Sequence, residues 1–277
     1  MRDNRCSLPI GSAHRRYGAR DDTRSHFGLF VAIFALPHLV VLAYQLVGLV
    51  FQSPSPNLSN ILLTASWTIG AAVLTLVVSA VSQAATVVAV SNFLLDRPAS
   101  VTDSFSKIKG QLLGILVLSL LCTVAAWFGL FVFIVPGVIL WIMWSLAVPV
   151  KVLEQKGVFD SMSRSMELTK GSWGRIFVIG LLIVALRFGV SALLNWPVLI
   201  AAGFSMRGGV RQMGVVWQVA VQVSTFVSTS LVGALATIAF SVVYYDQRVR
   251  KEAFDLQFMM TTLDATALPS SPAQAGA

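Results

Sequence analysis

The chain has 277 residues, of which 56% are apolar and only 12% are charged, and its formal net charge is +8. Water-soluble domains carry about 25% charged residues, so this composition excludes a water-facing exterior for most of the chain. Two cysteines, one in a polar arm and one in an apolar run, exclude a disulfide framework. The composition therefore predicts an all-α integral membrane protein.

Residues 1–26 form a polar, Arg-rich arm that precedes the first apolar run. The run that follows is too long for the apolar region of a secretory signal, and it has no small-residue cleavage site. We therefore expect an uncleaved N-terminal arm that stays in the cytoplasm.

Six apolar runs are long enough to cross a bilayer, which takes about 20 residues. They cover approximately residues 27–51, 61–95, 111–131, 135–152, 176–202 and 215–245. A tight apolar turn near Pro136 and Gly137 separates the third run from the fourth. The second and sixth runs exceed the thickness of the hydrocarbon layer, so we expect them to tilt, kink or project outward. The prediction is a polytopic bundle of six transmembrane helices, a membrane domain over residues 27–257.

The basic residues predict the orientation of these spans. Of the 20 Lys and Arg residues, 17 lie before span one, between spans two and three, between spans four and five, or after span six. Positive loops are retained in the cytoplasm, so both termini should be cytoplasmic. The same distribution favours membrane topology over nucleic-acid binding. The Ala/Pro/Ser-rich tail, residues 258–277, is expected to be a disordered cytoplasmic segment.

Two short amphipathic segments, at about residues 101–109 and 158–170, lie between apolar runs. A helical projection of the second places Val158, Phe159, Met162 and Met166 within one arc of about 100°. Helices of this kind beside a span lie in the membrane interface. The two segments match over seven positions with an offset of 57 residues, which indicates repeated helical hairpins.

Charged residues at the cytoplasmic ends of the spans form a candidate charge network. Its members are Asp96, Glu154, Asp160, Arg164, Glu167, Lys170, Asp246 and Arg248. The spacing of Asp160 and Arg164 predicts an i,i+4 ion pair. Acidic groups at helix C-termini oppose the helix dipole, so they need partners. The first interpretation is pairing with nearby basic residues, and the alternative is a cytoplasmic site for a cation or a substrate.

A second candidate site is intramembrane and consists of Arg187 and His38, supported by Gln83, Gln218 and Gln222. An intramembrane Arg is costly and should face protein or water. It could contact an anionic headgroup inside the bundle, or it could bond to neighbouring helices. The spans hold no Asp or Glu away from their cytoplasmic ends, and no His has ligand spacing with another His, Cys or carboxylate. We therefore predict no catalytic residues, no metal and no cofactor.

The segment VPVKVLEQKGVFDSMSRSMELTKGSWGRI resembles a signature of the bacterial family called the membrane domain of glycerophosphoryl diester phosphodiesterase. The matching residues are Pro149, Glu154, Asp160, Ser165, Leu168, Lys170, Gly171 and Trp173, whereas Met166 stands for the usual Trp and Ser161 for the usual Ala. The closing motif of that family is similar at Tyr244, Asp246, Arg248, Arg250, Ala253, Asp255 and Leu256. The resemblance implies a largely uncharacterised multi-span protein of the bacterial cytoplasmic membrane, without the catalytic barrel in the name of the family.

Three functional hypotheses follow. The first is a non-catalytic membrane protein that organises lipid, or a membrane or cytoplasmic protein partner, at the cytoplasmic face. The second is a transporter or flippase-like permease for a small anionic or phospholipid-related substrate, because such proteins bind substrates at repeat interfaces near the midplane. The third is the membrane part of a lipid phosphodiesterase system. Membrane lipids are the expected partners in each.

Overall fold

The computed structural model describes residues 15–51, 57–95, 97, 100–206 and 214–267, and all regular structure within them is helical. The elements are α1 (Arg15–Phe51), α2 (Leu58–Leu94), α3 (Val101–Ile108), a 3-10 turn (Lys109–Gln111), α4 (Leu112–Val132), α5 (Ile134–Trp144), α6 (Ala147–Glu154), α7 (Val158–Thr169), α8 (Trp173–Met206) and α9 (Val215–Ala267). Six helical segments of the described chain are long and apolar enough to cross a membrane. The prediction of an all-α polytopic bundle is confirmed.

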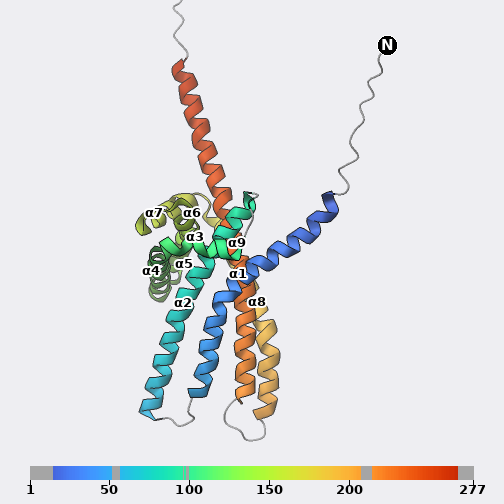
Figure 1. The fold of residues 1–277 in the computed structure, drawn as a ribbon. Helices are drawn as coiled ribbons and strands as arrows, with labels where there is room; N and C mark the ends of the chain where they lie inside the picture. The colour runs from blue at the N-terminus through green and yellow to red at the C-terminus, as the bar shows by residue number, and fades with distance from the viewer. Residues whose placement is uncertain (1–14, 52–56, 96, 98–99, 207–213, 268–277) are drawn as a thin grey trace, which may run out of the picture.

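The helices divide into two groups (Figure 1). Helices α1, α2, α8 and α9 run side by side down the picture, and we call them the four-helix part. Helices α3, α6 and α7 gather at one end of it, which we call the charged end. Helix α4 is seen nearly end-on in the same view, so the α4–α5 hairpin lies at a steep angle to the four-helix part.

Two prolines explain where the apolar hairpin breaks. A proline inside a helix has no N–H to donate to the carbonyl four residues earlier, and its ring crowds that carbonyl. Pro136 stands four residues after Val132, the last residue of α4, and Pro149 stands four residues after Ser145, where α5 has just ended. The fourth predicted span is therefore not one helix but two, α5 and α6. The predicted turn at Pro136 and Gly137 falls instead at Phe133, because proline is tolerated in the first turn of α5.

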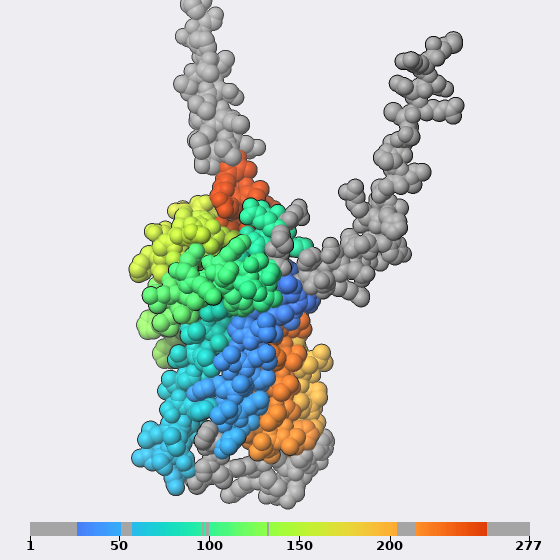
Figure 2. Space-filling model, viewed as in Figure 1, coloured from blue at the N-terminus to red at the C-terminus, as the bar shows by residue number. Residues whose placement is uncertain are grey.

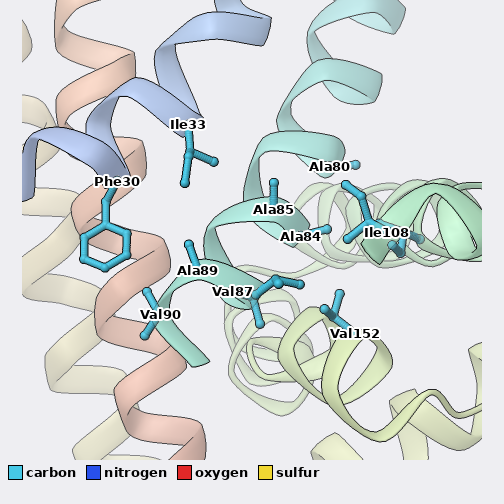
Figure 3. Close-up of a cluster of buried hydrophobic side chains, with 12 residues drawn as sticks. Phe30, Ile33, Ala80, Ala84, Ala85, Val87, Ala89, Val90, Ile108 and Val152 are labelled. Atoms are coloured by element: carbon cyan, nitrogen blue, oxygen red, sulfur yellow. The ribbon is translucent and has the colours of Figure 1, made fainter. Parts of the chain in front are cut away.

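The core of the bundle lies beside the charged end, where α1, α2, α3 and α6 meet (Figure 3). Helix α2 contributes alanines, including Ala84 and Ala85, which are fully buried. Such small side chains allow helix backbones to approach closely in membranes. Ile33 from α1 and Ile108 from α3 fill the remaining space. All buried residues of α2 lie between Val78 and Asn92, so the first half of that helix is largely uncovered.

Both chain ends differ from the expected outline. Helix α1 begins at Arg15, inside the predicted polar arm, while residues 1–14 lie outside the described residues. Helix α9 continues to Ala267, so the first ten residues of the tail that we expected to be disordered are helical. That stretch contains good helix formers, including Met, Leu and Ala, and the first tail proline comes two residues after the helix ends. Helix α9 projects well beyond the bundle (Figure 1).

Candidate functional site at the charged end

Glu154, the last residue of α6, is the centre of the interactions at the charged end. The Tyr244 hydroxyl donates a hydrogen bond to Glu154 Oε1 at 2.9 Å, and Lys156 Nζ lies 2.9 Å from Glu154 Oε2. Arg164 Nε lies 3.7 Å from the same oxygen. The Glu154 side chain is only 9% exposed, so both of its oxygens are occupied within the protein. These partners offset the unfavourable position of a carboxylate at a helix C-terminus.

Arg164 connects α7 to α9. Its Nη2 lies 3.3 Å from Glu252 Oε1, and its Nη1 lies 3.3 Å from Glu167 Oε2. Glu252 is also paired with Arg248, at 2.9 Å. The predicted pair of Asp160 with Arg164 is wrong, since the ion pairs of Arg164 go to Glu154, Glu167 and Glu252. Glu167 is a local i,i+3 partner, whereas tertiary packing brings Glu154 and Glu252 to Arg164 from other helices.

Lys251 of α9 caps the C-terminal end of α7. Its ammonium group donates hydrogen bonds to the backbone carbonyls of Glu167 and Lys170, the second at 2.9 Å. A cation at a helix C-terminus satisfies free carbonyls and is favoured by the helix dipole. Gly171 follows with a φ of 85°, a left-handed conformation that ends the helix. Lys170, predicted as a charged member of the network, therefore takes part through its backbone oxygen.

A separate set of contacts involves Asp246. Arg175, near the start of α8, donates to Asp246 Oδ2 at 2.8 Å, and Arg250 lies 3.0 Å from Oδ1. Ser172 donates to Gln247 Oε1 at 3.0 Å, beside these ion pairs. These contacts bind α8 to α9 at the charged end. Asp96, the remaining predicted member, lies outside the described residues.

Five residues that bond to this network were not in the predicted set: Lys156, Arg175, Tyr244, Lys251 and Glu252. A signal existed for Glu252, which stands four residues after Arg248 on the same helix. Tyr244 belongs to the closing motif quoted above, and it is completely buried. A buried tyrosine needs a hydrogen-bond partner for its hydroxyl, and Glu154 is that partner.

Of the second candidate site, the structure brings His38 close enough to Arg187 for their charges to interact, but it does not gather all five residues into one place. His38 is buried, and its Nδ1–H donates to the Phe34 carbonyl oxygen at 2.8 Å. The hydroxyls of Ser79 and Ser82 lie 3.4 Å from its ring nitrogens. Its polar atoms are thus satisfied by α1 and α2. Arg187 is on the exposed surface of α8. Gln83 is half-buried on α2.

The other two glutamines of that candidate site lie at a different depth from Arg187. Helices α8 and α9 run antiparallel, and the bond of Ser172 to Gln247 sets their register. Arg187 then lies opposite residue 232, roughly 15 Å along the axis from Gln222 at 1.5 Å per residue. Gln218 lies one further turn away. Gln218 and Gln222 therefore do not form a single pocket with Arg187.

The fold and the charged end define a class: a polytopic all-α membrane protein whose polar contacts concentrate at one end of its helices. Within the described residues, no group of three or more His, Cys, Asp or Glu could hold a metal ion. The chain belongs to the uncharacterised protein family UPF0259, which it matches over residues 43–203. No curated protein and no solved structure shows significant similarity to it.

Proposed function

We propose that this protein is a non-catalytic component of the bacterial cytoplasmic membrane that organises anionic phospholipid at the cytoplasmic face. The charged end would then be cytoplasmic, in keeping with the retention of basic loops on that side. The resemblance to the membrane domain of glycerophosphoryl diester phosphodiesterase agrees with this proposal, because that family is largely uncharacterised and often lacks a catalytic domain.

The observation that carries the proposal is an excess of basic side chains at the charged end. Eleven basic and six acidic side chains are described there: Arg97, Lys107, Lys109, Lys151, Lys156, Arg164, Lys170, Arg175, Arg248, Arg250 and Lys251 against Asp103, Glu154, Asp160, Glu167, Asp246 and Glu252. Four of the six carboxylates are taken up by internal ion pairs. Basic residues beside an anionic membrane surface each contribute about 1 kcal/mol of attraction.

The outward side of α7 has the chemistry of a membrane interface. Phe159 is 77% exposed, although it lies on a short helix otherwise packed against the bundle. Lys170 is exposed at the other end of that helix, and Lys109 is exposed after α3. No ion pair is recorded for either lysine among the described residues. An exposed apolar ring and exposed lysines on the short helices suit the boundary between acyl chains and headgroups.

The test uses the purified full chain in phosphatidylcholine vesicles with and without phosphatidylglycerol. Energy transfer from the protein to a headgroup-labelled phosphatidylglycerol measures local enrichment of that lipid. The double variant Lys109→Gln and Lys170→Gln should reduce the enrichment on the order of tenfold. The matched variant Lys109→Arg and Lys170→Arg retains both charges and should behave as wild type.

Equal enrichment in both variants would remove the basis for lipid organisation. Hydrolysis of a glycerophosphodiester by the purified chain would overturn its non-catalytic character and favour a part in a lipid phosphodiesterase system. Uptake of an anionic solute by the same vesicles would favour the permease. That alternative has little support in the geometry, because Arg187 is exposed on α8 and Gln218 and Gln222 lie at a different depth.

A further inference from the structure

The α4–α5 hairpin has an unusually apolar tip. No charged residue occurs between Leu112 and Val150. At the turn itself, the side chains of Phe131, Phe133, Ile134 and Val135 are between 66% and 90% exposed. Large apolar side chains gathered at a turn are unfavourable in water, so the composition of this turn indicates surroundings of hydrocarbon.

The turns of the other two hairpins have a different composition. The connection between α1 and α2 includes the sequence QSPSPN at 52–57, and the one between α8 and α9 includes RGGVRQMG at 207–214. Both are rich in polar residues, and the second carries two arginines. Polar turns belong at a water boundary, where helices that cross the bilayer emerge. The turn at Phe133 is apolar, so by the same criterion it does not reach the water boundary.

The packing of the hairpin also differs from that of the four-helix part. Its base is held in the core by Ile115 and Leu118, which are fully buried. Its outer half is open, with Trp127 and Phe128 about 70% and 68% exposed. In Figure 2 the green segments lie beside the upper part of the molecule, and the lower ends of α1 and α2 extend well beyond them. The uncovered first half of α2 fits this arrangement, because the hairpin does not run along it.

Part of the backbone of the turn is hydrogen-bonded within the hairpin. A single residue, Phe133, separates the two helices, and its N–H donates to the Gly129 carbonyl at 2.9 Å. The Gly137 N–H donates to the Phe133 carbonyl at 3.2 Å, and Pro136 has no N–H to satisfy. Unpaired backbone groups are very costly in hydrocarbon. A Cβ on Gly137 would lie 2.4 Å from the Leu130 nitrogen, so glycine permits this close return of the chain.

We infer that the α4–α5 hairpin does not cross the membrane but is embedded in the hydrocarbon of the leaflet next to the charged end, with acyl chains of that leaflet as its partner. The hairpin leaves from and returns to the charged end, so the basic loops on both sides of it remain on one side of the membrane. The four long helices make the crossings, and the termini still share a side. This inference goes beyond the proposed lipid-organising role and does not rest on it.

The experiment uses single-cysteine variants of the full chain in a Cys6→Ser, Cys122→Ala background. The informative position is Val135→Cys at the hairpin turn, with Ser55→Cys in the α1–α2 connection and Ser163→Cys on the exposed side of α7 as references. A membrane-impermeant maleimide is applied to right-side-out and inverted vesicles. The two references should each react from one side, opposite to each other, and Val135→Cys should react from neither.

A second measurement separates lipid burial from burial in protein. A fluorophore at position 135 should be quenched by lipids that carry an acyl-chain quencher in the leaflet nearer Ser163, and not by the same lipids in the other leaflet. Phe131→Cys, at 90% exposure, provides an independent position should Val135→Cys fold poorly. Maleimide reaction at the turn from either side overturns the inference, as does quenching from the far leaflet or from neither leaflet. None of these outcomes depends on enrichment of anionic lipid.

Discussion

Helices α3 and α7 have similar sequences and similar local structure, but they are held in the fold by different contacts. Both begin at matching positions of the 57-residue offset, and both bury a serine at the fourth residue, Ser104 and Ser161. Each serine hydroxyl donates to the carbonyl four residues earlier, at 2.8 Å and 2.6 Å. In α3 the apolar residues Val101, Phe105 and Ile108 face the core.

Helix α7 is rotated relative to its pattern. Its buried residues are Ser161, Met162, Ser165, Leu168 and Thr169, and Phe159 points outward. This inward face lies about 70° around the helix from the predicted apolar arc at 100° per residue. Helix α3 is bonded to α2 through Lys107 and Asn92 Oδ1 at 3.2 Å, whereas α7 has more polar bonds, including Ser165 to the Met143 carbonyl at 2.7 Å and the ion pairs of Arg164. Polar anchors thus decide the rotation of a short helix when its apolar face is weak.

The largest effect on this comparison should come from removing buried aliphatic side chains. Leu168→Ala in α7 and Ile108→Ala in α3 each leave a cavity in a packed cluster, at a cost of about 3 kcal/mol in the free energy of unfolding. The measurement is circular dichroism of the purified protein during titration with SDS in mixed micelles. A cost below about 1 kcal/mol in either variant would show that its helix is not packed as described.

A smaller loss in the free energy of unfolding is expected when the ion pairs of Glu154 are removed. Glu154→Gln removes the charge that Lys156 and Arg164 share and weakens the bond from Tyr244, which should cost about 2 kcal/mol. Asp160→Asn is the control, because Asp160 is exposed and no ion pair of it is recorded; its change should stay within about 0.5 kcal/mol.

The variant Glu154→Gln also tests the rotation of α7. Phe159→Cys in the Cys6→Ser, Cys122→Ala background should react readily with a maleimide, because this side chain is exposed. Combination with Glu154→Gln should slow that reaction, because α7 can then turn Phe159 toward the bundle. An unchanged rate would mean that serine and backbone bonds alone set the rotation.

The two equivalent serines should respond alike and modestly. Ser104→Ala and Ser161→Ala each lose a buried hydrogen bond but gain helix propensity, so a net cost of about 0.5 kcal/mol is expected in both. The comparison uses the same SDS titration. Costs that differ by more than about 1 kcal/mol would break the equivalence of α3 and α7.

The smallest effect is expected at the outer ion pair of Asp246. Arg250→Gln removes a partner that is 61% exposed, so the loss should be about 0.5 kcal/mol or less. It should vanish in high salt, because exposed charges are screened within about 10 Å at 0.1 M ionic strength. A loss that persists in high salt would show that this pair is shielded from solvent.

The sequence predicts the spans well because about 20 apolar residues in succession have no other stable environment. It does not reveal that Pro149 divides the fourth run, since the run itself stays apolar across the break at Ser145. It also places Arg164 with the wrong partner. Periodicity predicts neighbours three and four positions away, whereas Glu252 is 88 positions from Arg164 and meets it only when α7 packs against α9.

The predicted intramembrane set includes two glutamines that the fold separates from Arg187, for a related reason. Span assignment places Arg187 near the midplane of α8, but depth alone does not say which side of a helix faces its neighbours. Gln218 and Gln222 belong to the far end of α9, which follows from the antiparallel register of α8 and α9 and not from their spacing in the sequence. Polar residues in different spans become a site only when register and rotation both agree.

Helix α9 also has a mechanical consequence. It is one continuous helix of 53 residues, about 80 Å long at 1.5 Å per residue, and more than twice the thickness of the hydrocarbon layer. A load applied to its projecting end would pass along the helix axis to the charged end. There Glu252 and Lys251 would transmit it to α7, and Tyr244 would transmit it to α6. A pull on the C-terminal helix would therefore act on the short helices at the charged end as well as on the spans.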